Sequence, residues 1–338
     1  MGVDLKDIIK SREITLERLS GHTIAIDAYN ALYQFLASIR GETGEPLMDE
    51  QGRITSHISG LFYRNINLLA LGIKPIYIMD GKPPSLKTNE IERRKAEKQK
   101  AVVKYMKALS HGDNKEAKKY AQATSVMKDY MIEDTKKMVS LLGIPFIEAP
   151  SEGEATAAYF TSSGITSATA SQDFDSLLFG ASKLIRNLTV SGKRKLPGRS
   201  MYVQVEPEEI ELGKLLSNLE VTRSQLVDIG ILIGTDFNPE GFRGIGPVRA
   251  LKFIKKYECL ERIPDIQIDL RDIDYEGIRE IFLHPDVASL TQIKWEDPNS
   301  DGIIEFLCDE HSFSEARVTK ALQKLEDVMN KKSETLER

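Results

Sequence analysis

Seven carboxylates occupy places in this 338-residue chain where short apolar runs end or a helical run begins. The apolar runs alternate with segments of helical periodicity, which is typical of an α/β fold with a mainly parallel central sheet flanked by helices. In such sheets ligands bind beyond the carboxyl ends of the strands, so we expect these acids to converge in one crevice. The seven are Asp27, Asp80, Glu152, Glu154, Asp173, Asp175 and Asp236.

A crevice with this many carboxylates needs cations, because ionised acids repel one another. No His or Cys lies in the acidic segments, which argues against zinc and favours Mg²⁺ or Mn²⁺ with oxygen ligands. Seven acids are too many for one octahedral Mg²⁺ ion that keeps some of its waters, so two metals fit better. Two neighbouring metals are the apparatus of phosphodiester hydrolysis. Each Asp taken alone is also explained as a turn or cap residue.

Composition sets the outer limits of function. A hydrophobic content of 41% and a charged content of 29% are ordinary for a soluble protein. The two cysteines, Cys259 and Cys308, give no disulfide framework and indicate a reducing compartment. The first residues have no signal-peptide pattern, and no apolar run reaches membrane length. We therefore expect a cytoplasmic protein without a targeting segment.

The net charge of −5 conceals a separation of signs. Residues 82–128 contain 13 Lys+Arg and five Asp+Glu, a local charge of +8, so the rest of the chain carries −13. An acidic metal pocket that faces a basic substrate clamp would produce this separation. For residues 90–107 alone, the solvated face of an ordinary helix is the alternative explanation.

We expect a single domain over residues 1–338, and hydrophobic periodicity divides it into regions. Residues 1–80 predict strand, helix, loop, helix and strand, with helices over 28–39 and 55–71 and a buried strand over 74–79. Residues 81–132 are helix-forming, charged and poor in large apolar side chains. With a break near residues 110–113, they predict two helices that project from the body and are mobile without a ligand.

The α/β pattern returns over residues 133–258 and is followed by a helical part over 259–328 and a tail over 329–338. A basic turn, Ser191–Gly198, contains Lys193 and Arg194. It predicts a hairpin tip between strands over 184–189 and 201–205.

The segment Gly241–Ala250 predicts a backbone grip on phosphate. Within a hairpin motif over 241–256, Gly244-Ile245-Gly246-Pro247 opens a helix, which resembles the hairpin of helix–hairpin–helix DNA-binding motifs. Glycines let the backbone approach a phosphate closely, and Pro suits a first helical turn. Arg249 and Lys252 add basic groups to the same helix. A plain tight turn is the alternative for a lone Gly-x-Gly.

With these motifs the chain resembles the structure-specific 5′ nucleases, and closely the archaeal-type flap endonucleases. The resemblance covers nearly the whole chain. Its most specific pieces are Met1–Val3, Tyr29–Phe35, Thr55–His57, Asp80–Pro84, Ala149–Ala155, Ser171–Asp175 and Arg243–Pro247.

The resemblance implies the activity and the roles of particular residues. The family cuts 5′ single-stranded flaps at the junction with duplex DNA, with an associated 5′-3′ exonuclease activity, in Okazaki-fragment processing and long-patch base excision repair. The seven acids match the ligands of two Mg²⁺ ions, for which Mn²⁺ can substitute. Lys87 and Arg94 match basic residues that polarise the scissile phosphate, and Tyr33 matches an aromatic that stacks on a flipped base. Gly2 matches a residue whose N-terminal amine, exposed after removal of Met1, lies close to the metals.

The resemblance also implies the contacts with DNA. Residues 82–132 match an arch through which the flap threads. The region from Gly52 to Arg64 matches the pocket for a one-nucleotide 3′ flap. The hairpin at Gly244 and Gly246 matches an element that holds duplex phosphate with a K⁺ ion at its backbone. We expect a monomer that acts on 5′-flap DNA. Without the resemblance, Tyr33 would be interpreted as a core residue, and Lys87 and Arg94, seven residues apart, as solvated charges on one helix face.

One departure concerns the sliding-clamp motif that commonly ends the family's chains. Leu336 fits the aliphatic position of that motif, but Ser333 replaces its Gln, and the aromatic pair would fall just beyond Arg338. Two other classes are weighed: a small metal ribonuclease, which would lack the hairpin and the arch, and a DNA-junction scaffold, which would lack an acid.

Overall fold

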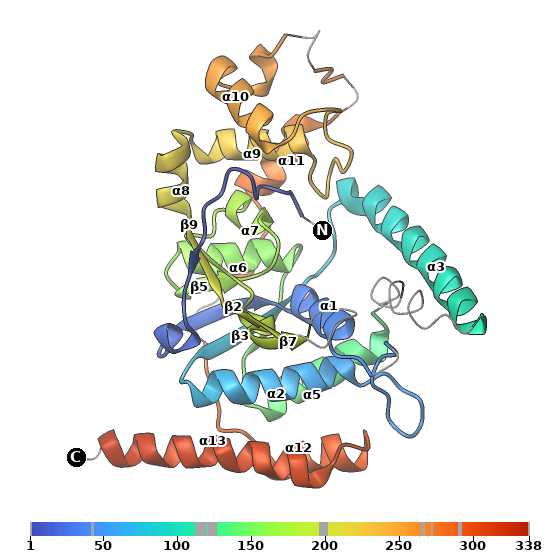
Figure 1. Ribbon diagram of the computed structural model, residues 1–338. Coiled ribbons are helices and arrows are strands. Elements are labelled where there is room, and N and C mark those ends of the chain that lie inside the picture. Colours follow the sequence, from blue (N-terminus) through green and yellow to red (C-terminus); the bar gives the residue numbers. More distant parts are fainter. Residues whose placement is uncertain are drawn as a thin grey trace.

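A seven-stranded sheet lies at the centre of the computed structural model, which describes residues 2–41, 44–111, 120, 127–195, 202–264, 268–271, 273–289 and 293–336. The five strands from β6 to β4 pair in parallel, whereas β9 pairs antiparallel with β6 and β1. The predicted mainly parallel sheet is therefore confirmed (Figure 1). In sheet order the strands are β1 (Arg12–Glu13), β9 (Glu208–Glu211), β6 (Lys183–Arg186), β5 (Ala168–Ala170), β2 (Thr23–Asp27), β3 (Lys74–Met79) and β4 (Phe146–Glu148).

Both faces of the sheet are buried, which explains why its central strands are apolar throughout. Ile24 and Ile26 of β2 face the layer of α1 (Ala28–Ser38) and α2 (Ser56–Ala70). Ala25 and Ile78 face the opposite layer, where they pack against Phe160 of α6 (Gly153–Ser162). Successive side chains of a strand point to opposite faces, so this strand type needs helices on both sides.

The predicted order of elements in residues 1–80 is confirmed, since β2, α1, α2 and β3 follow one another with bounds close to those expected. The bottom layer continues with α5 (Asp129–Leu141) and the C-terminal helices (Figure 1). These are α12 (Ser300–Ile304), a π-helical turn (Glu305–Asp309) and α13 (Glu315–Leu336). Helix α13 packs against α2 and runs through most of the range predicted as a tail.

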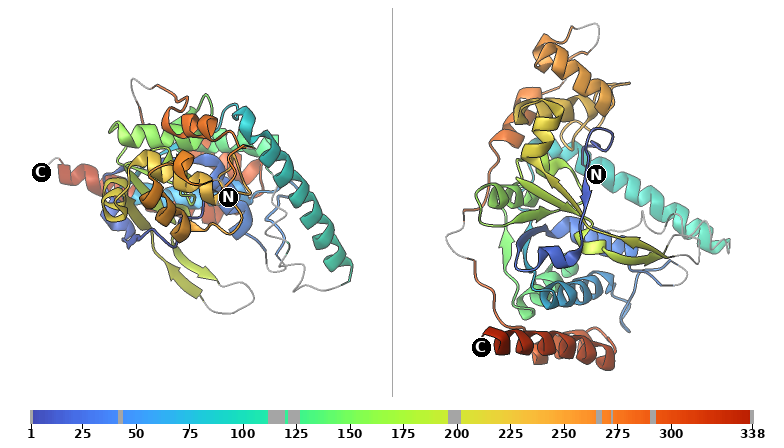
Figure 2. Two further views of the ribbon diagram at one scale, coloured as in Figure 1. Left: turned by 90° about the horizontal axis from the view of Figure 1, so that it is seen from above. Right: turned by 60° about the vertical axis from the view of Figure 1, so that its left-hand side comes forward.

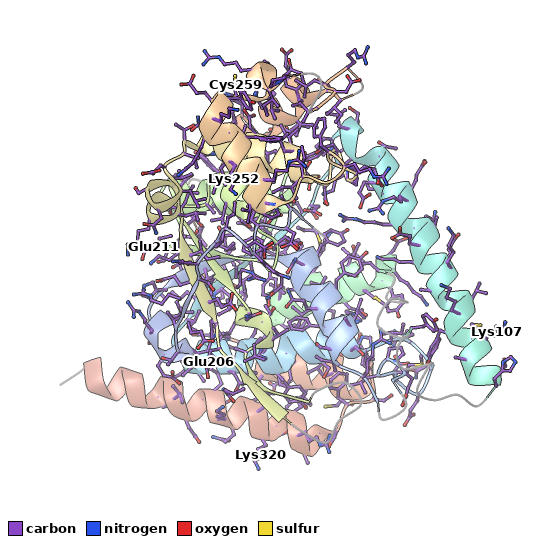
Figure 3. All side chains as sticks on the ribbon, turned by 45° about the horizontal axis from the view of Figure 1, so that its top comes forward. Lys107, Glu206, Glu211, Lys252, Cys259 and Lys320 are labelled. Atoms are coloured by element: carbon purple, nitrogen blue, oxygen red, sulfur yellow. The ribbon has the colours of Figure 1, made fainter. Side chains whose placement is uncertain are left out.

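The described part of the predicted arch is a long helix, α3 (Thr88–Ser110), preceded by a 3₁₀ turn (Ser85–Lys87). It projects from the body, and Lys107 lies near its outer end (Figures 1 and 3). Helix α3 ends at the break predicted near residues 110–113. The second predicted helix lies largely outside the described residues.

One predicted strand and one predicted strand pairing are wrong. The apolar run that ends at Asp236 belongs to helix α9 (Arg223–Ile233), because Thr222 and Gln225 form a capping box that starts a helix there. The hairpin at the basic turn pairs β7 (Gly192–Lys195) with β8 (Tyr202–Val205). Residues 184–189 do not form its first arm, because Lys183–Arg186 is occupied as β6 of the central sheet.

The other end of the molecule is helical (Figures 1 and 2). It contains α7 (Asp175–Leu178), α8 (Leu212–Leu219), α9, α10 (Pro247–Tyr257) and α11 (Tyr275–Leu283). Short 3₁₀ turns lie at Leu16–Leu19, Leu188–Val190 and Leu260–Arg262. Among the described residues no helix is long and apolar enough to cross a membrane.

Candidate active site and nucleic-acid interface

The carboxyl ends of four consecutive strands deliver six of the seven acids to one place. Strands β5, β2, β3 and β4 are neighbours in the sheet, so the residues that follow them share one edge. Asp236 joins them from the loop after helix α9 rather than from a strand. Asp27 ends β2, Asp80 follows β3, Glu152 and Glu154 follow β4, and Asp173 and Asp175 follow β5.

Local backbone geometry fixes several of these side chains, because helices begin where the strands end. Asp27 caps α1, and Glu152 and Glu154 lie at the start of α6. Unpaired N–H groups of first helical turns are therefore close to the acids. Three backbone bonds result: Asn30 N to Asp27 (3.0 Å), Gly153 N to Asp80 (2.6 Å) and Ser176 N to Glu154 (3.0 Å). Val3 N, in the extended start of the chain, donates to Asp175 at 2.7 Å.

Burial dominates the electrostatics of the acids. Burial, with the nearby charge of Asp80, raises the pKa of Asp27 to about 8. Burial, with the charge of Asp236, raises the pKa of Asp175 to about 7. The pKa of Glu154 is raised well above its usual range by burial and by Asp175. The protein thus holds several acids whose ionised forms are insufficiently compensated by its own cations.

Two cations reach into this group from the base of the projecting helix. Lys87 Nζ lies 2.5 Å from Glu152 Oε2 and 3.4 Å from Asp236 Oδ2. Burial alone would lower the pKa of Lys87, but the charges of Glu152 and Asp236 raise it above its ordinary value. Arg94 donates to both Asp236 and Glu90. Lys87 belongs to the 3₁₀ turn and Arg94 to α3, yet both side chains reach Asp236.

The donor set fits hard divalent cations, because it consists of carboxylate oxygens with several raised pKa values. Within the described ranges, however, no three His, Cys, Asp or Glu side chains are placed to coordinate one ion. Lys87 and Arg94 lie among the acids instead. Metal ions would have to compete with these two side chains.

Gly2 lies at this site, and Tyr33 lies on α1, the helix that Asp27 caps. Tyr33 is half-buried, and Lys98 Nζ of α3 lies 4.1 Å from the centre of its ring. It is therefore not a core residue, which is the interpretation that composition alone favoured. Gly2 lies against Asp175, because an added Cβ would fall 2.7 Å from that carboxyl carbon. The chain start is thus held beside the acids.

The predicted 3′-flap region and the basic hairpin meet through Arg64. Arg64 of α2 donates to Ser191 Oγ at 3.2 Å, directly before β7. Lys193 and Arg194 lie on β7, and their side chains lie outside the described part of the structure. Burial lowers the pKa of Arg64, which remains a cation.

The predicted phosphate grip is an exposed turn between α9 and α10. Gly244 has φ +78°, a conformation that favours glycine, and Gly246 caps α10 with Pro247 in its first turn. Ile245 is buried and anchors the turn, so the glycine backbone faces solvent. Arg249 donates to Gly244 O at 3.3 Å, and Lys252 is exposed on the same helix (Figure 3).

A second group of acids lies elsewhere, next to α2, and contacts two buried histidines. We call it the histidine–aspartate cluster: His57, Asp134, His311 and Asp49. His57 Nε2 lies 3.4 Å from Asp134, and His311 lies 3.6 Å from Asp134 and 3.5 Å from Asp49. Burial raises the pKa of Asp134, but the contacts with His311 and His57 outweigh it and lower that pKa to about 2.

Sequence reasoning did not single out two polar neighbours of the acids. Ser176 donates its backbone N–H and its hydroxyl to Glu154. Asn30 donates its side-chain amide to Asp173 at 3.0 Å. Their positions gave a usable signal, since Ser176 directly follows Asp175 and Asn30 lies three residues after Asp27.

Family models match two regions of the chain. The XPG N-terminal domain matches residues 1–101, and the XPG I-region matches residues 143–236. Flap endonuclease 1 of Nitrosopumilus maritimus is 56% identical over 337 residues, covering 100% of this chain and 99% of its own. The enzyme of the same name from Pyrococcus abyssi is 50% identical, covering 100% and 98%. The chain belongs to the flap endonuclease family.

Solved structures agree with this assignment. The flap endonuclease-1 from Methanococcus jannaschii has a TM-score of 0.77 and 40% identity, covering 98% of this chain and 100% of its own. The catalytic core of Rad2 in complex with DNA substrate has a TM-score of 0.70 at 23% identity, covering 93% and 96%. The second similarity concerns the fold alone.

Proposed function

We propose that the seven acids of this family member hold two divalent cations, Mg²⁺ with Mn²⁺ as a substitute. The chain is a metal-dependent 5′ flap endonuclease, a phosphodiester hydrolase with the family's role in DNA replication and repair. The observation that carries the proposal is the set of buried acids with raised pKa values and too few cationic partners. When bound, the cations supply Lewis-acid activation of water and stabilise charge on the phosphate.

Within this proposal the acids divide by position. Glu152 and Asp80 lie near Lys87, on the side of the site that faces α3. Glu154 and Asp175 are held by backbone donors instead, Ser176 N and Val3 N. Backbone bonds that point at carboxylates hold their orientation, so little reorganisation is needed when a cation binds.

Lys87 and Arg94 change partners in the proposed mechanism. Both pair with acids that divalent cations would neutralise. Once those acids are neutralised, Lys87 and Arg94 are free to pair with the other anion present, the scissile phosphate. A cation placed on that phosphate favours the transition state, in which negative charge grows. Their attachment to the base of α3 couples this step to the arch.

Tyr33 and Gly2 complete the catalytic group. The half-buried ring of Tyr33, next to Tyr29 on α1, offers a face on which an unpaired base can stack, which offsets part of the cost of unpairing. Lys98 occupies that face and would move aside. Gly2 lies against Asp175, so once Met1 is removed its free amine would add a positive charge close to the phosphate.

Affinity for DNA comes from separate elements. The exposed turn at Gly244 and Gly246 would present backbone groups to duplex phosphate and would hold a K⁺ ion, and Arg249 and Lys252 add charge. Arg64 with Lys193 and Arg194 forms a second contact. Phosphate contacts of this kind position a substrate without reading its sequence.

The proposal extends to the oligomeric state and to a protein partner. The protein acts as a monomer on flap DNA in the cytoplasm. A sliding clamp binds at residues 333–338, where Leu336 supplies the aliphatic anchor.

A cleavage assay tests the proposal. A labelled 5′-flap duplex, a single strand and a plain duplex are each incubated with enzyme in Mg²⁺ and in EDTA. The proposal expects a cut at the flap junction in Mg²⁺ only, and far less product from the other two DNAs. Flap binding without Mg²⁺-dependent cleavage would identify a junction-binding scaffold instead.

A further inference from the structure

Asn30 joins two of the proposed metal ligands by direct hydrogen bonds. Its backbone N–H donates to Asp27 Oδ1 at 3.0 Å, and its side-chain Nδ2 donates to Asp173 Oδ2 at 3.0 Å. Asp27 ends β2, whereas Asp173 follows β5. One residue of α1 therefore sets the relative placement of carboxylates from two neighbouring strands.

The orientation of the Asn30 amide follows from its neighbours. The backbone N–H of Gln172 points at one end of that amide at 3.2 Å, and a backbone N–H can only donate. That end is therefore the oxygen, and the NH₂ group is the end that faces Asp173. The amide donates to Asp173 without adding a positive charge that would compete with a divalent cation.

Two further hydrogen bonds in series hold the side chain of Asn30 in place. Gln34 Nε2, one helical turn further on, donates to Asn30 Oδ1 at 2.7 Å. Thr189 Oγ1 donates to Gln34 Oε1 at 2.6 Å. The chain runs from the 3₁₀ turn after β6 through α1 to the acids, and each member has a defined donor or acceptor role.

We propose that Asn30 is a positioning residue that orients Asp27 and Asp173 for divalent-cation binding, with Gln34 and Thr189 as its support. The inference rests on the proposed metal site. A carboxylate that ligates a metal loses affinity when the partner that orients it is removed, typically by about 10- to 100-fold. The effect should decline along the chain from Asn30 to Gln34 to Thr189, because each step is further from the carboxylates.

The test is a calorimetric titration of Mn²⁺ into metal-free protein, which needs no DNA and no turnover. We expect Asn30→Ala to weaken Mn²⁺ binding by about 10-fold or more, Gln34→Ala by less, and Thr189→Val by least. Asn67→Ala is the matched control, because the side chain of Asn67 on α2 accepts a hydrogen bond from Lys324 in a place distant from the acids. Cleavage by Asn30→Ala should recover at high Mn²⁺, since the ligands themselves remain.

Wild-type Mn²⁺ affinity in a folded Asn30→Ala protein would overturn the inference. If Asn30→Ala does not fold, Gln34→Ala decides instead, and unchanged affinity there has the same meaning. Failure of the metal site itself looks different, because Mn²⁺ would then bind the wild-type protein no better than it binds Asp27→Asn.

Discussion

Two groups of buried acids in this molecule have opposite electrostatics. In the carboxylate site, burial and neighbouring acids raise the pKa of Asp27 to about 8. In the histidine–aspartate cluster, contacts with two imidazoles overcome burial and lower the pKa of Asp134 to about 2. Burial is common to both, so the partners decide the direction. A buried acid whose charge is balanced by protein partners stabilises the fold, whereas a buried acid without enough partners can bind a cation from solution.

The largest expected effect concerns the carboxylate site. Asp27→Asn keeps the shape of the side chain and removes its charge. We expect single-turnover cleavage of a 5′ flap to fall by about 10³-fold or more, because metal ligation supplies several kcal/mol to the transition state. The same substitution should not lower the melting temperature of the metal-free protein near neutral pH, because Asn keeps the bond from Asn30 N and replaces an acid that is mostly protonated there. A loss of stability without a loss of rate would contradict the assignment.

Lys87→Ala tests the carboxylate site by removing one of the two cations that lie among its acids. We expect the single-turnover rate to fall by about 10²-fold, since one preorganised cation on the phosphate has that value, while flap affinity stays nearly unchanged. Mn²⁺ should bind the metal-free variant more tightly, because a competing cation has been removed from Glu152 and Asp236. An unchanged rate with weakened flap binding would make Lys87 a simple phosphate clamp.

Asp134→Ala tests the histidine–aspartate cluster. It leaves His57 and His311 buried without their shared carboxylate, so the free energy of unfolding should fall by about 2 kcal/mol, measured by denaturant titration. Cleavage by the folded variant in Mg²⁺ should stay within a few-fold of wild type. Loss of cleavage in a stable variant would mean that the cluster takes part in chemistry.

The pH dependence of stability separates the two groups with a smaller effect. A lowered pKa, as in Asp134, stabilises the fold above about pH 4, and this contribution is lost as the pH falls toward 2. A raised pKa, as in Asp27, contributes stability below about pH 4 that is lost as the pH rises toward 8. Between pH 5 and 8, the metal-free protein should therefore become less stable, and Ca²⁺ should restore more of its melting temperature at pH 8 than at pH 5. An equal Ca²⁺ effect at both pH values would contradict this.

The sequence predicted the parts of the fold that depend on local patterns. The strands before Asp27 and Asp80 are continuous apolar runs, and burial on both faces produces such runs. The run before Asp236 has the same composition and is helical, because the capping box at Thr222 lies upstream of the run itself. Apolar content alone does not distinguish a buried strand from a buried helix.

The site was predictable as a set of ligands but not as an arrangement. Seven acids at the ends of apolar runs indicate a metal crevice from sequence alone. The pairing of Lys87 with Glu152 depends on how α3 meets the sheet edge, which no local pattern encodes. The same is true of the contact between His57 and Asp134, whose residues are 77 positions apart in the sequence.

Proton release on metal binding tests the central claim most directly. Ca²⁺ is titrated into metal-free protein at pH 7.5 by calorimetry in two buffers with different ionisation enthalpies, which gives the number of protons released. Asp27, with a pKa of about 8, is mostly protonated at this pH, and Glu154 has a strongly raised pKa. The account predicts release of about one proton or more, and less in Asp27→Asn. Binding without proton release, unchanged in Asp27→Asn, would contradict the claim that these buried acids are the cation ligands.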